Sequence, residues 1–246
     1  MTDKIFLFLS AILPTLALLL FFMYSDKFKE PKKTVLSTFI LGIFIIAPLQ
    51  VFHYGTEMII GEPIEYNAFF KAFFAAAFLE ELFKFCVLFF FCTKFTEFNE
   101  PMDGIVYGLT ASLGFAFWEN LQYIYMPDRE INESLQVAWS RAFTAVPSHA
   151  FDGVIMGFFI GRHYFRDYKT NTNLILALLI PVTLHGFYDW VLMEENINGN
   201  LGIYLNLDEK IKMNTSVSYL GKRKSVGGLQ DSLQNYHIDY DDLFSL

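Results

Sequence analysis

The chain has 246 residues, of which 54% are hydrophobic, 29 are phenylalanine and only 18% are charged. This composition is more apolar than that of a soluble domain of the same length, and it excludes an ordinary water-soluble enzyme. The net charge of −8, with no long basic stretch in the sequence, excludes a nucleic-acid partner.

Six apolar blocks follow one another along the chain, and each is long enough to cross about 30 Å of hydrocarbon as an α-helix. They cover residues 5–24, 34–54, 67–91, 104–126, 138–162 and 173–193. The sequence therefore predicts an all-α fold, a polytopic transmembrane helical bundle of about six spans, in a domain of residues 1–193. Residues 194–246 contain no further apolar stretch of spanning length and are predicted to form a polar tail, disordered or divergent.

The distribution of lysine and arginine predicts the orientation of the chain in the membrane. Segment 25–33 contains four lysines, and segments 92–103 and 162–172 contain further basic residues. Short loops rich in lysine and arginine stay in the cytoplasm, so these three segments are predicted to be cytoplasmic. The chain is therefore expected in a bacterial cytoplasmic (inner) membrane with its N-terminus outside.

Ionisable residues are concentrated in the last four blocks. Away from the block ends, these residues are Glu80, Glu81, Lys84, Glu119, His149, Asp152, His185 and Asp189. Each costs a few kcal/mol at membrane depth, roughly, unless it is paired or hydrated. We therefore expect one shared polar interior rather than separate sites.

The spacing of these residues places several of them on common helix faces. The pairs are Glu80 with Lys84, His149 with Asp152, and His185 with Asp189. Residues three or four apart lie on one face of a helix. Asp152 and Asp189 are interpreted as supporting residues that orient the two histidines. Pro147 and Pro181 precede the histidines, where a kink can widen the space between helices.

Such a set suits hydrolysis by an activated water. A carboxylate can take the proton of the attacking water and return it to the leaving amine, while histidines bind a metal or donate to the oxyanion. Individual contacts also have structural interpretations, for example an internal ion pair between Glu81 and Lys84. Two other functions stay open from the residues alone: a proton-relaying transporter, and a catalytically inactive membrane scaffold.

In these residues the sequence resembles the PrsW family of intramembrane proteases, within the wider superfamily of CAAX prenyl endopeptidases and Abi proteins. The landmarks are Asp26–Pro31 (DKFKEP), Phe78–Lys84 (FLEELFK), Asp103–Tyr107 (DGIVY), Gly114–Tyr123 (GFAFWENLQY), Arg141–Gly161 (with PSHAFDGVIMGFFIG) and Leu184–Trp190 (LHGFYDW). They occur in order over most of residues 1–192. Family members usually have a further hydrophobic helix after the His185 segment, where this chain has its polar tail.

The resemblance implies a role for each site residue. Glu80 and Glu81 are similar to the double-glutamate motif of the family, Glu119 to the acid of its next motif, and His149 and His185 to its two histidines. His149, His185 and Glu119 are the implied metal ligands, and Lys84, Asn120, Asp152 and Asp189 are supporting residues. Zn²⁺ and a metal-free, glutamate-activated water are both compatible with this set.

The resemblance also implies a substrate and a place of cleavage. The expected partner is a single-span membrane protein such as an anti-sigma factor, cut at a first site in a stress-response cascade. Counted from the predicted outer ends of their spans, Glu119, His185 and His149 lie roughly 10 to 17 Å deep. Cleavage is therefore expected in the outer half of the bilayer.

Overall fold

The computed structural model describes residues 2–25, 30–60, 68–127, 129–166 and 171–193. Its elements are α1 (Thr2–Ser25), α2 (Lys32–Phe44), α3 (Ile46–Ile60), α4 (Ala68–Phe70), the π-helix η1 (Lys71–Ala77), α5 (Phe78–Phe90), the short 3₁₀ helix η2 (Cys92–Lys94), α6 (Pro101–Ile124), α7 (Ile131–Phe143), α8 (Ala145–Phe165) and α9 (Asn171–Met193). The described residues form no β-strand, and the all-α prediction is confirmed. The predicted tail 194–246 lies outside the described residues.

Every predicted apolar block is helical in the structure. Among the described residues, four helical segments are long and apolar enough to cross a membrane: Ile5–Tyr24, Lys32–Gly55, Ile131–Phe165 and Asn171–Met193. In the other two predicted spans, 67–91 and 104–126, the structure has helix from Ala68 to Phe90 and from Pro101 to Ile124, and these helices contain Glu80, Glu81, Lys84 and Glu119. The prediction of a helical membrane bundle is therefore confirmed.

Two predicted spans are interrupted, and a proline accounts for each interruption. The block predicted as 138–162 begins earlier, at Ile131, and breaks at Thr144 between α7 and α8. Pro147 lacks the N–H that would bond the Phe143 carbonyl, and its ring would clash with that carbonyl. Pro48 has the same relation to the Phe44 carbonyl, where α2 ends. Pro181, in contrast, lies inside the continuous helix α9.

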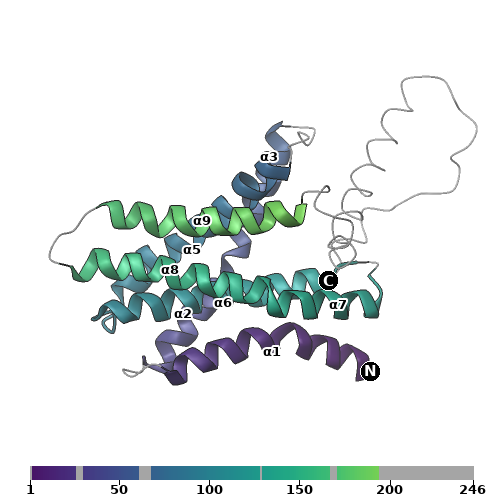
Figure 1. The fold of residues 1–246 in the computed structure, drawn as a ribbon, viewed down its shortest axis with the longest axis horizontal. Helices are drawn as coiled ribbons and strands as arrows, with labels where there is room; N and C mark the ends of the chain where they lie inside the picture. The colour runs from purple at the N-terminus through teal and green to yellow at the C-terminus, as the bar shows by residue number, and fades with distance from the viewer. Residues whose placement is uncertain (1, 26–29, 61–67, 128, 167–170, 194–246) are drawn as a thin grey trace, which may run out of the picture. The chain divides into compact units, whose positions relative to one another are not determined.

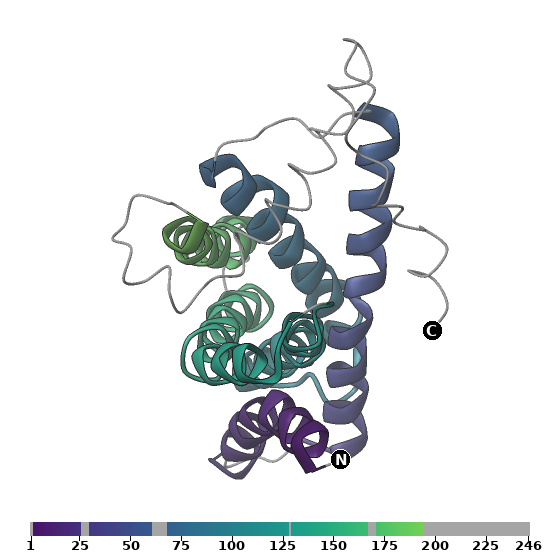
Figure 2. The same ribbon diagram turned by 90° about the vertical axis from the view of Figure 1, so that its right-hand side faces the viewer.

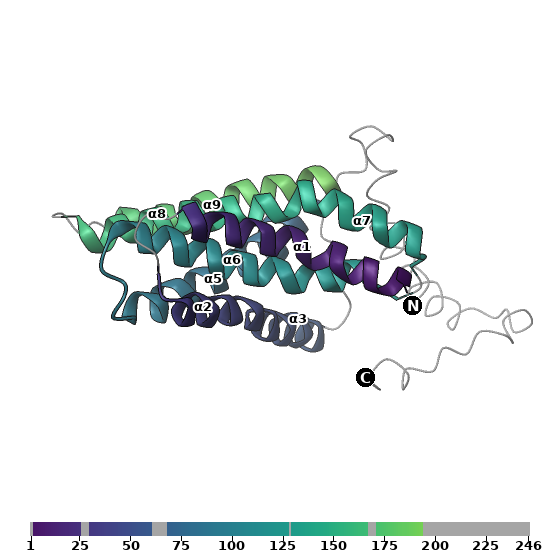
Figure 3. The ribbon, with the colours of Figure 1, turned by 90° about the horizontal axis from the view of Figure 1, so that it is seen from below.

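The helix α6 lies at the centre of the bundle. It is buried along most of its length and packs on α1, α2, α5, α7 and α8. Figure 1 shows α9 lying along α8, with α1 on the opposite side of α6. The end-on view in Figure 2 shows α6 and α8 surrounded by α1, α5, α9 and the pair α2 and α3, which follow each other end to end. Figure 3 shows α1 crossing over α6 and α8.

Glycines allow α6 and α8 to approach each other closely. Gly104 and Gly108 of α6 face Gly153, Gly157 and Gly161 of α8. A Cβ atom added at Gly157 would lie 2.0 Å from the Gly104 carbonyl oxygen. Small residues at four-residue spacing let helix backbones touch, which is how membrane helices associate without a hydrophobic driving force. This contact holds the α8 face that presents His149 close to α6.

Two sequence landmarks stabilise the N-terminal end of α6. The Asp103 carboxylate accepts hydrogen bonds from the backbone N–H groups of Asn99 and Glu100, each at 2.7 Å, and so caps the helix. The buried Tyr107 donates its hydroxyl hydrogen to the carboxylate of Glu30. The contact between Tyr107 and Glu30 links the segment before α2 to α6. The landmarks DKFKEP and DGIVY therefore have a structural role.

We expect Gly157→Ala to destabilise the bundle, because its methyl group must push α8 away from the α6 backbone. The free energy of unfolding should fall by about 1 to 3 kcal/mol. Gly55→Ala in α3 is the matched control, because no described atom lies within 4 Å of its added Cβ. That variant should be neutral or stabilised by up to about 1 kcal/mol. Thermal unfolding of both variants in detergent measures the difference, and equal midpoints would contradict the glycine contact.

Candidate active site

The ionisable residues predicted to share a polar interior meet at one place in the bundle. Five helices contribute: α5 carries Glu80, Glu81 and Lys84, α6 carries Glu119 and Asn120, α7 carries Arg141, α8 carries His149 and Asp152, and α9 carries His185 and Asp189. The π-helix η1 directly precedes the two glutamates of α5. Short π-helical segments occur frequently at functional sites. The ionisable residues of these helices thus lie together in one interior, as the sequence led us to expect.

Lys84 lies at the most buried point of the site. Its Nζ atom is 2.7 Å from Glu81 Oε1 and 3.1 Å from His149 Nδ1, and it lies 4.5 Å from the centre of the Phe115 ring. The side chains of Lys84 and Glu81 are 1% and 0% exposed. Lys84 is thus an internal cation that pairs with Glu81, not with Glu80.

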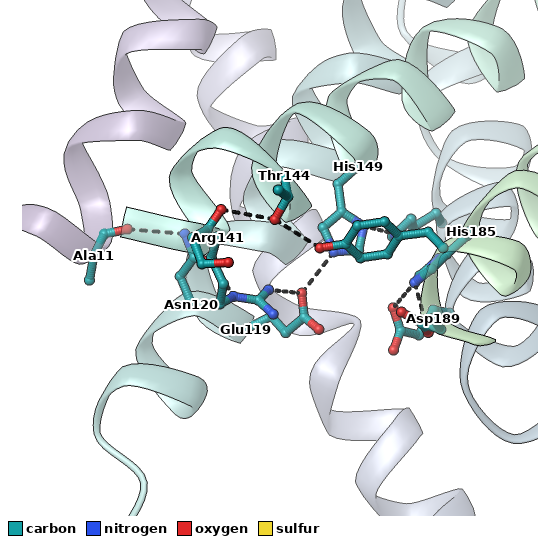
Figure 4. A network of polar contacts seen from close by, with 12 residues as sticks. Ala11, Glu119, Asn120, Arg141, Thr144, His149, His185 and Asp189 are labelled. Carbon is teal, nitrogen blue, oxygen red and sulfur yellow. Dashed lines mark hydrogen bonds and ion pairs between the residues drawn. The ribbon is translucent and has the colours of Figure 1, made fainter. Parts of the chain in front are cut away.

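Glu119 connects His149 to the outer rim of the site. Its Oε2 atom is 2.7 Å from His149 Nε2 and 2.6 Å from Arg141 Nη2. Arg141 Nε donates to Asn120 Oδ1 at 2.7 Å, and Asn120 Nδ2 donates to the Ala11 carbonyl at 3.2 Å. Figure 4 shows this line of contacts from α1 to His149.

His185 lies among three carboxylates. Its Nδ1 atom is 2.8 Å from Glu81 Oε1, while its Nε2 atom is 3.4 Å from Asp189 Oδ2 and 3.7 Å from Glu80 Oε2. The His149 and His185 rings lie nearly perpendicular, with their centres 5.0 Å apart. The two histidines therefore form the middle of the site, with carboxylates on both sides (Figure 4).

The hydrogen-bond partners place one ring proton on each histidine. An ammonium group only donates, so His149 Nδ1 accepts from Lys84, and the ring proton is on Nε2, which donates to Glu119. Glu81 Oε1 accepts from Lys84, so it also accepts the Nδ1–H of His185. The Nε2 side of the His185 ring faces Glu80 and Asp189.

Asp152 and Asp189 differ in their relation to the histidines. Asp189 lies beside His185 Nε2, as its spacing predicts. Asp152 is 1% exposed, and its Oδ2 atom has no hydrogen-bond partner among the residues that the structure describes. His149 is held by Lys84 and Glu119, not by Asp152. The predicted bond between Asp152 and His149 is therefore absent among the described contacts. A role for Asp152 rests on its position beside the site.

Two overlapping groups have ligand atoms close enough to hold a metal ion. Glu81, His149, Asp152 and His185 form a buried group, and Glu80, Glu119 and His149 form a less buried one; in each, the ligand atoms lie within 4.8 Å of one another. The ammonium of Lys84 already contacts two members of the buried group. In the second group Lys84 contacts only His149. The implied ligands His149, His185 and Glu119 are thus divided between the two groups.

Arg141 is the site residue that the sequence reasoning did not single out. Its guanidinium contacts Glu119 and Asn120 and stacks 4.2 Å from the centre of the Tyr123 ring. A signal was present in the sequence, because Arg141 is a cation just inside a predicted span. Such residues usually face the interior of a bundle and pair there.

Carboxylates and histidines that meet inside a bundle of membrane-crossing helices are the groups that a water-activating intramembrane hydrolase requires. The family model described as PrsW family intramembrane metalloprotease matches residues 30–207. The chain belongs to this family. It is accordingly a protease, and so a hydrolase, embedded in a membrane.

Relatives support the same assignment over most of the chain. Protease PrsW of Geobacillus kaustophilus is 37% identical over 201 residues, which cover 80% of this chain and 83% of the relative. Protease PrsW of Bacillus subtilis is 38% identical, with coverage of 74% and 81%, and that of Clostridioides difficile is 32% identical, with 78% and 81%. No solved structure matches the chain. Protease relatives of this extent favour the hydrolase over the transporter hypothesis.

The two adjacent glutamates are expected to differ in their contribution to stability. Glu81→Gln leaves the Lys84 ammonium buried without its carboxylate, and breaking such a pair costs about 3 to 5 kcal/mol. Glu80 is 15% exposed and lies 3.7 Å from its nearest ionic partner, so Glu80→Gln should cost much less. Thermal unfolding of Glu80→Gln, Glu81→Gln and the double variant Glu81→Gln/Lys84→Met measures the stability that each change removes.

The double variant should recover part of the loss, because it removes the orphaned charge. Equal destabilisation by Glu80→Gln and Glu81→Gln would contradict the pairing of Lys84 with Glu81.

Proposed function

We propose that this protein is an intramembrane endopeptidase that cleaves a single-span membrane protein, such as an anti-sigma factor, with an activated water in the outer half of the bilayer. The observation that carries the proposal is the pair of facing histidines between carboxylates of α5, α6 and α9. Protease activity follows from the family, whereas the substrate, the site residues and the place of cleavage are the proposal.

Glu80 is the group best placed to act as the general base. Its Oε2 atom is buried and has no hydrogen-bond partner within the described part of the chain, so it is available to a water molecule. His185 Nε2 lies beside it at 3.7 Å. Glu80 would take a proton from the attacking water and return it to the leaving amine.

The remaining site residues hold this arrangement in place. Glu81 binds Lys84 and the Nδ1–H of His185, so it determines which way the His185 ring faces. Glu119 and Lys84 do the same for His149 from opposite sides of its ring. Asp189 lies beside His185, and Asn120 bonds Arg141, which in turn bonds Glu119. Oriented imidazoles are suited to stabilising the charge that develops on the peptide oxygen.

The donor set also fits zinc, which takes imidazole nitrogens and carboxylate oxygens. Glu80, Glu119 and His149 would hold the ion, because Lys84 already contacts two ligands of the other group. When bound, zinc would polarise the substrate carbonyl and activate a water. His149 Nε2 must then give up its proton to Nδ1, so the bond between Lys84 and His149 has to break.

Topology supports cleavage near the outer face. With basic loops in the cytoplasm and the N-terminus outside, α6 and α9 end on the outer side. Glu119 lies about one and a half turns before the end of α6 at Ile124, and His185 about two turns before the end of α9 at Met193. We assign the protein to a bacterial inner membrane on the same basis. The relation to CAAX prenyl endopeptidases and Abi proteins, which have similar acid and histidine motifs, is also part of the proposal.

We expect the purified protein to cleave at least one member of a panel of single-span anti-sigma factors in liposomes. Glu80→Gln should lower the rate by about 10² to 10⁴-fold, the usual contribution of a general base. Glu133→Gln, an acid in the first turn of α7, is the matched control and should keep wild-type activity. Mass spectrometry of the fragments should place the cut near the extracytoplasmic end of the substrate helix.

Full cleavage by Glu80→Gln would exclude Glu80 as the base. A cut near the cytoplasmic end would exclude the proposed orientation or depth.

Zinc binding is tested by elemental analysis of detergent-purified protein before and after chelator treatment. If zinc takes part, roughly one ion per chain should be retained, and both Glu119→Gln and Glu80→Gln should lower this occupancy. Chelation should remove the activity, and added zinc should restore it. Activity that persists without stoichiometric metal would instead establish a glutamate-activated water.

A further inference from the structure

Arg141 contacts two neighbouring side chains of α6 with different edges of its guanidinium group. Nη2 lies 2.6 Å from Glu119 Oε2, and Nε donates to Asn120 Oδ1 at 2.7 Å. The flat face of the group stacks on Tyr123, with 4.2 Å to the ring centre. The Arg141 side chain is only 11% exposed. The guanidinium of Arg141 is planar, and hydrogen bonds at its edges together with stacking on one face fix its orientation. This fixed group in turn orients the Glu119 carboxylate that it bonds.

The oxygen that Arg141 contacts is the one that His149 uses. Both Arg141 Nη2 and His149 Nε2 bond Glu119 Oε2, at 2.6 and 2.7 Å. Residues 141 and 149 are eight apart, about 12 Å along a continuous helix. The break at Thr144 and the length of the arginine side chain allow both groups to reach a single oxygen.

A contact to α9 holds the break itself. Tyr188, which precedes Asp189 in the chain, donates its hydroxyl hydrogen to Thr144 Oγ1 at 2.9 Å. On the other side, Asn120 donates to the Ala11 carbonyl of α1. Arg141 is therefore bonded to an Asn120 side chain that is itself bonded to α1, and the chain three residues after Arg141 is bonded to α9 (Figure 4).

The charges of the site require a second cation at this point. Lys84 bonds Glu81 and His149. Among the residues that the structure describes, the ionic partners of Glu119 are Arg141 and His149. A largely buried carboxylate is stable only when a cation and hydrogen bonds compensate its desolvation. With His149 neutral, Arg141 is the compensating cation of Glu119.

We propose that Arg141 is a positioning residue of the hydrolytic site: it keeps Glu119 charged and aimed at His149, and so sets the orientation of the His149 ring. The inference rests on the proposed function but concerns a residue without direct contact to the reacting atoms. Loss of Arg141 should slow the chemical step and leave substrate binding unchanged, because the residue acts through Glu119 and His149.

The test compares Arg141→Met, Arg141→Lys and the control Arg129→Met. Arg129 also bonds α6, through the Tyr123 carbonyl and Met126 Sδ, but does not contact Glu119. Arg141→Met should lower kcat by about 10 to 100-fold with unchanged KM. Arg141→Lys should recover part of the rate, because an ammonium can bond Glu119 but cannot bond Asn120 at the same time. Arg129→Met should keep the wild-type kcat.

A second measurement does not depend on catalysis. In ¹⁵N-histidine-labelled protein, which has five histidines, the His149 signal can be assigned by its loss in His149→Gln. The Nε2 signal should shift in Arg141→Met and stay in place in Arg129→Met.

Full kcat in Arg141→Met would overturn the inference and leave the proposed function intact. Lower activity that follows a loss of thermal stability, with an unmoved His149 signal, would also overturn it, because the role is then structural. If the wild-type protein cleaves no substrate, the proposed function fails. The His149 signal then decides the inference alone: a shift in Arg141→Met supports it, and an unmoved signal overturns it.

Discussion

The ammonium of Lys84, buried between Glu81 and His149, is the interaction on which the arrangement of the site depends. A charge at this depth is stable only when its partners are close and fully hydrogen-bonded. Lys84 Nζ meets this condition with Glu81 Oε1 at 2.7 Å and His149 Nδ1 at 3.1 Å. The consequences extend outward, because Glu81 also orients His185, and the proton left on His149 Nε2 is donated to Glu119. One buried cation thus sets the tautomer of His149 and, through Glu81, the partner of the His185 Nδ1–H.

The same interaction distinguishes the acidic residues from one another. Glu81 serves the internal ion pair, and Glu119 serves His149 and Arg141, so neither is as free as Glu80. Adjacent glutamates in one motif therefore have different environments: Glu81 is bonded by Lys84 and His185, whereas Glu80 has its nearest ionic partner, His185 Nε2, at 3.7 Å. This division of roles is the physical basis for naming Glu80, rather than Glu81, as the base.

Backbone features bring these side chains together from separate helices. Glycines hold α8 against α6, Pro147 breaks the fifth predicted span at Thr144, and a π-helix precedes the two glutamates of α5. Each feature has a cost in a regular helix, since proline removes a hydrogen bond and glycine gives up side-chain packing. In this arrangement Arg141 and His149 both reach one carboxylate oxygen of Glu119.

The sequence by itself determined the class of fold, the membrane setting, the family and the set of acids and histidines. Apolar blocks of spanning length and the high cost of charge in hydrocarbon are properties of composition and spacing, so they can be read without coordinates. Tertiary structure alone decided the partners. Spacing allowed Lys84 to pair with Glu80 or Glu81, and Asp152 to bond His149, yet Lys84 bonds Glu81, and His149 bonds Lys84 and Glu119. Arg141 of α7 meets Glu119 and Asn120 through the packing of α7 on α6. The reason is that periodicity defines which residues share a face of one helix, whereas contacts between helices depend on how closely and at which register the helices pack.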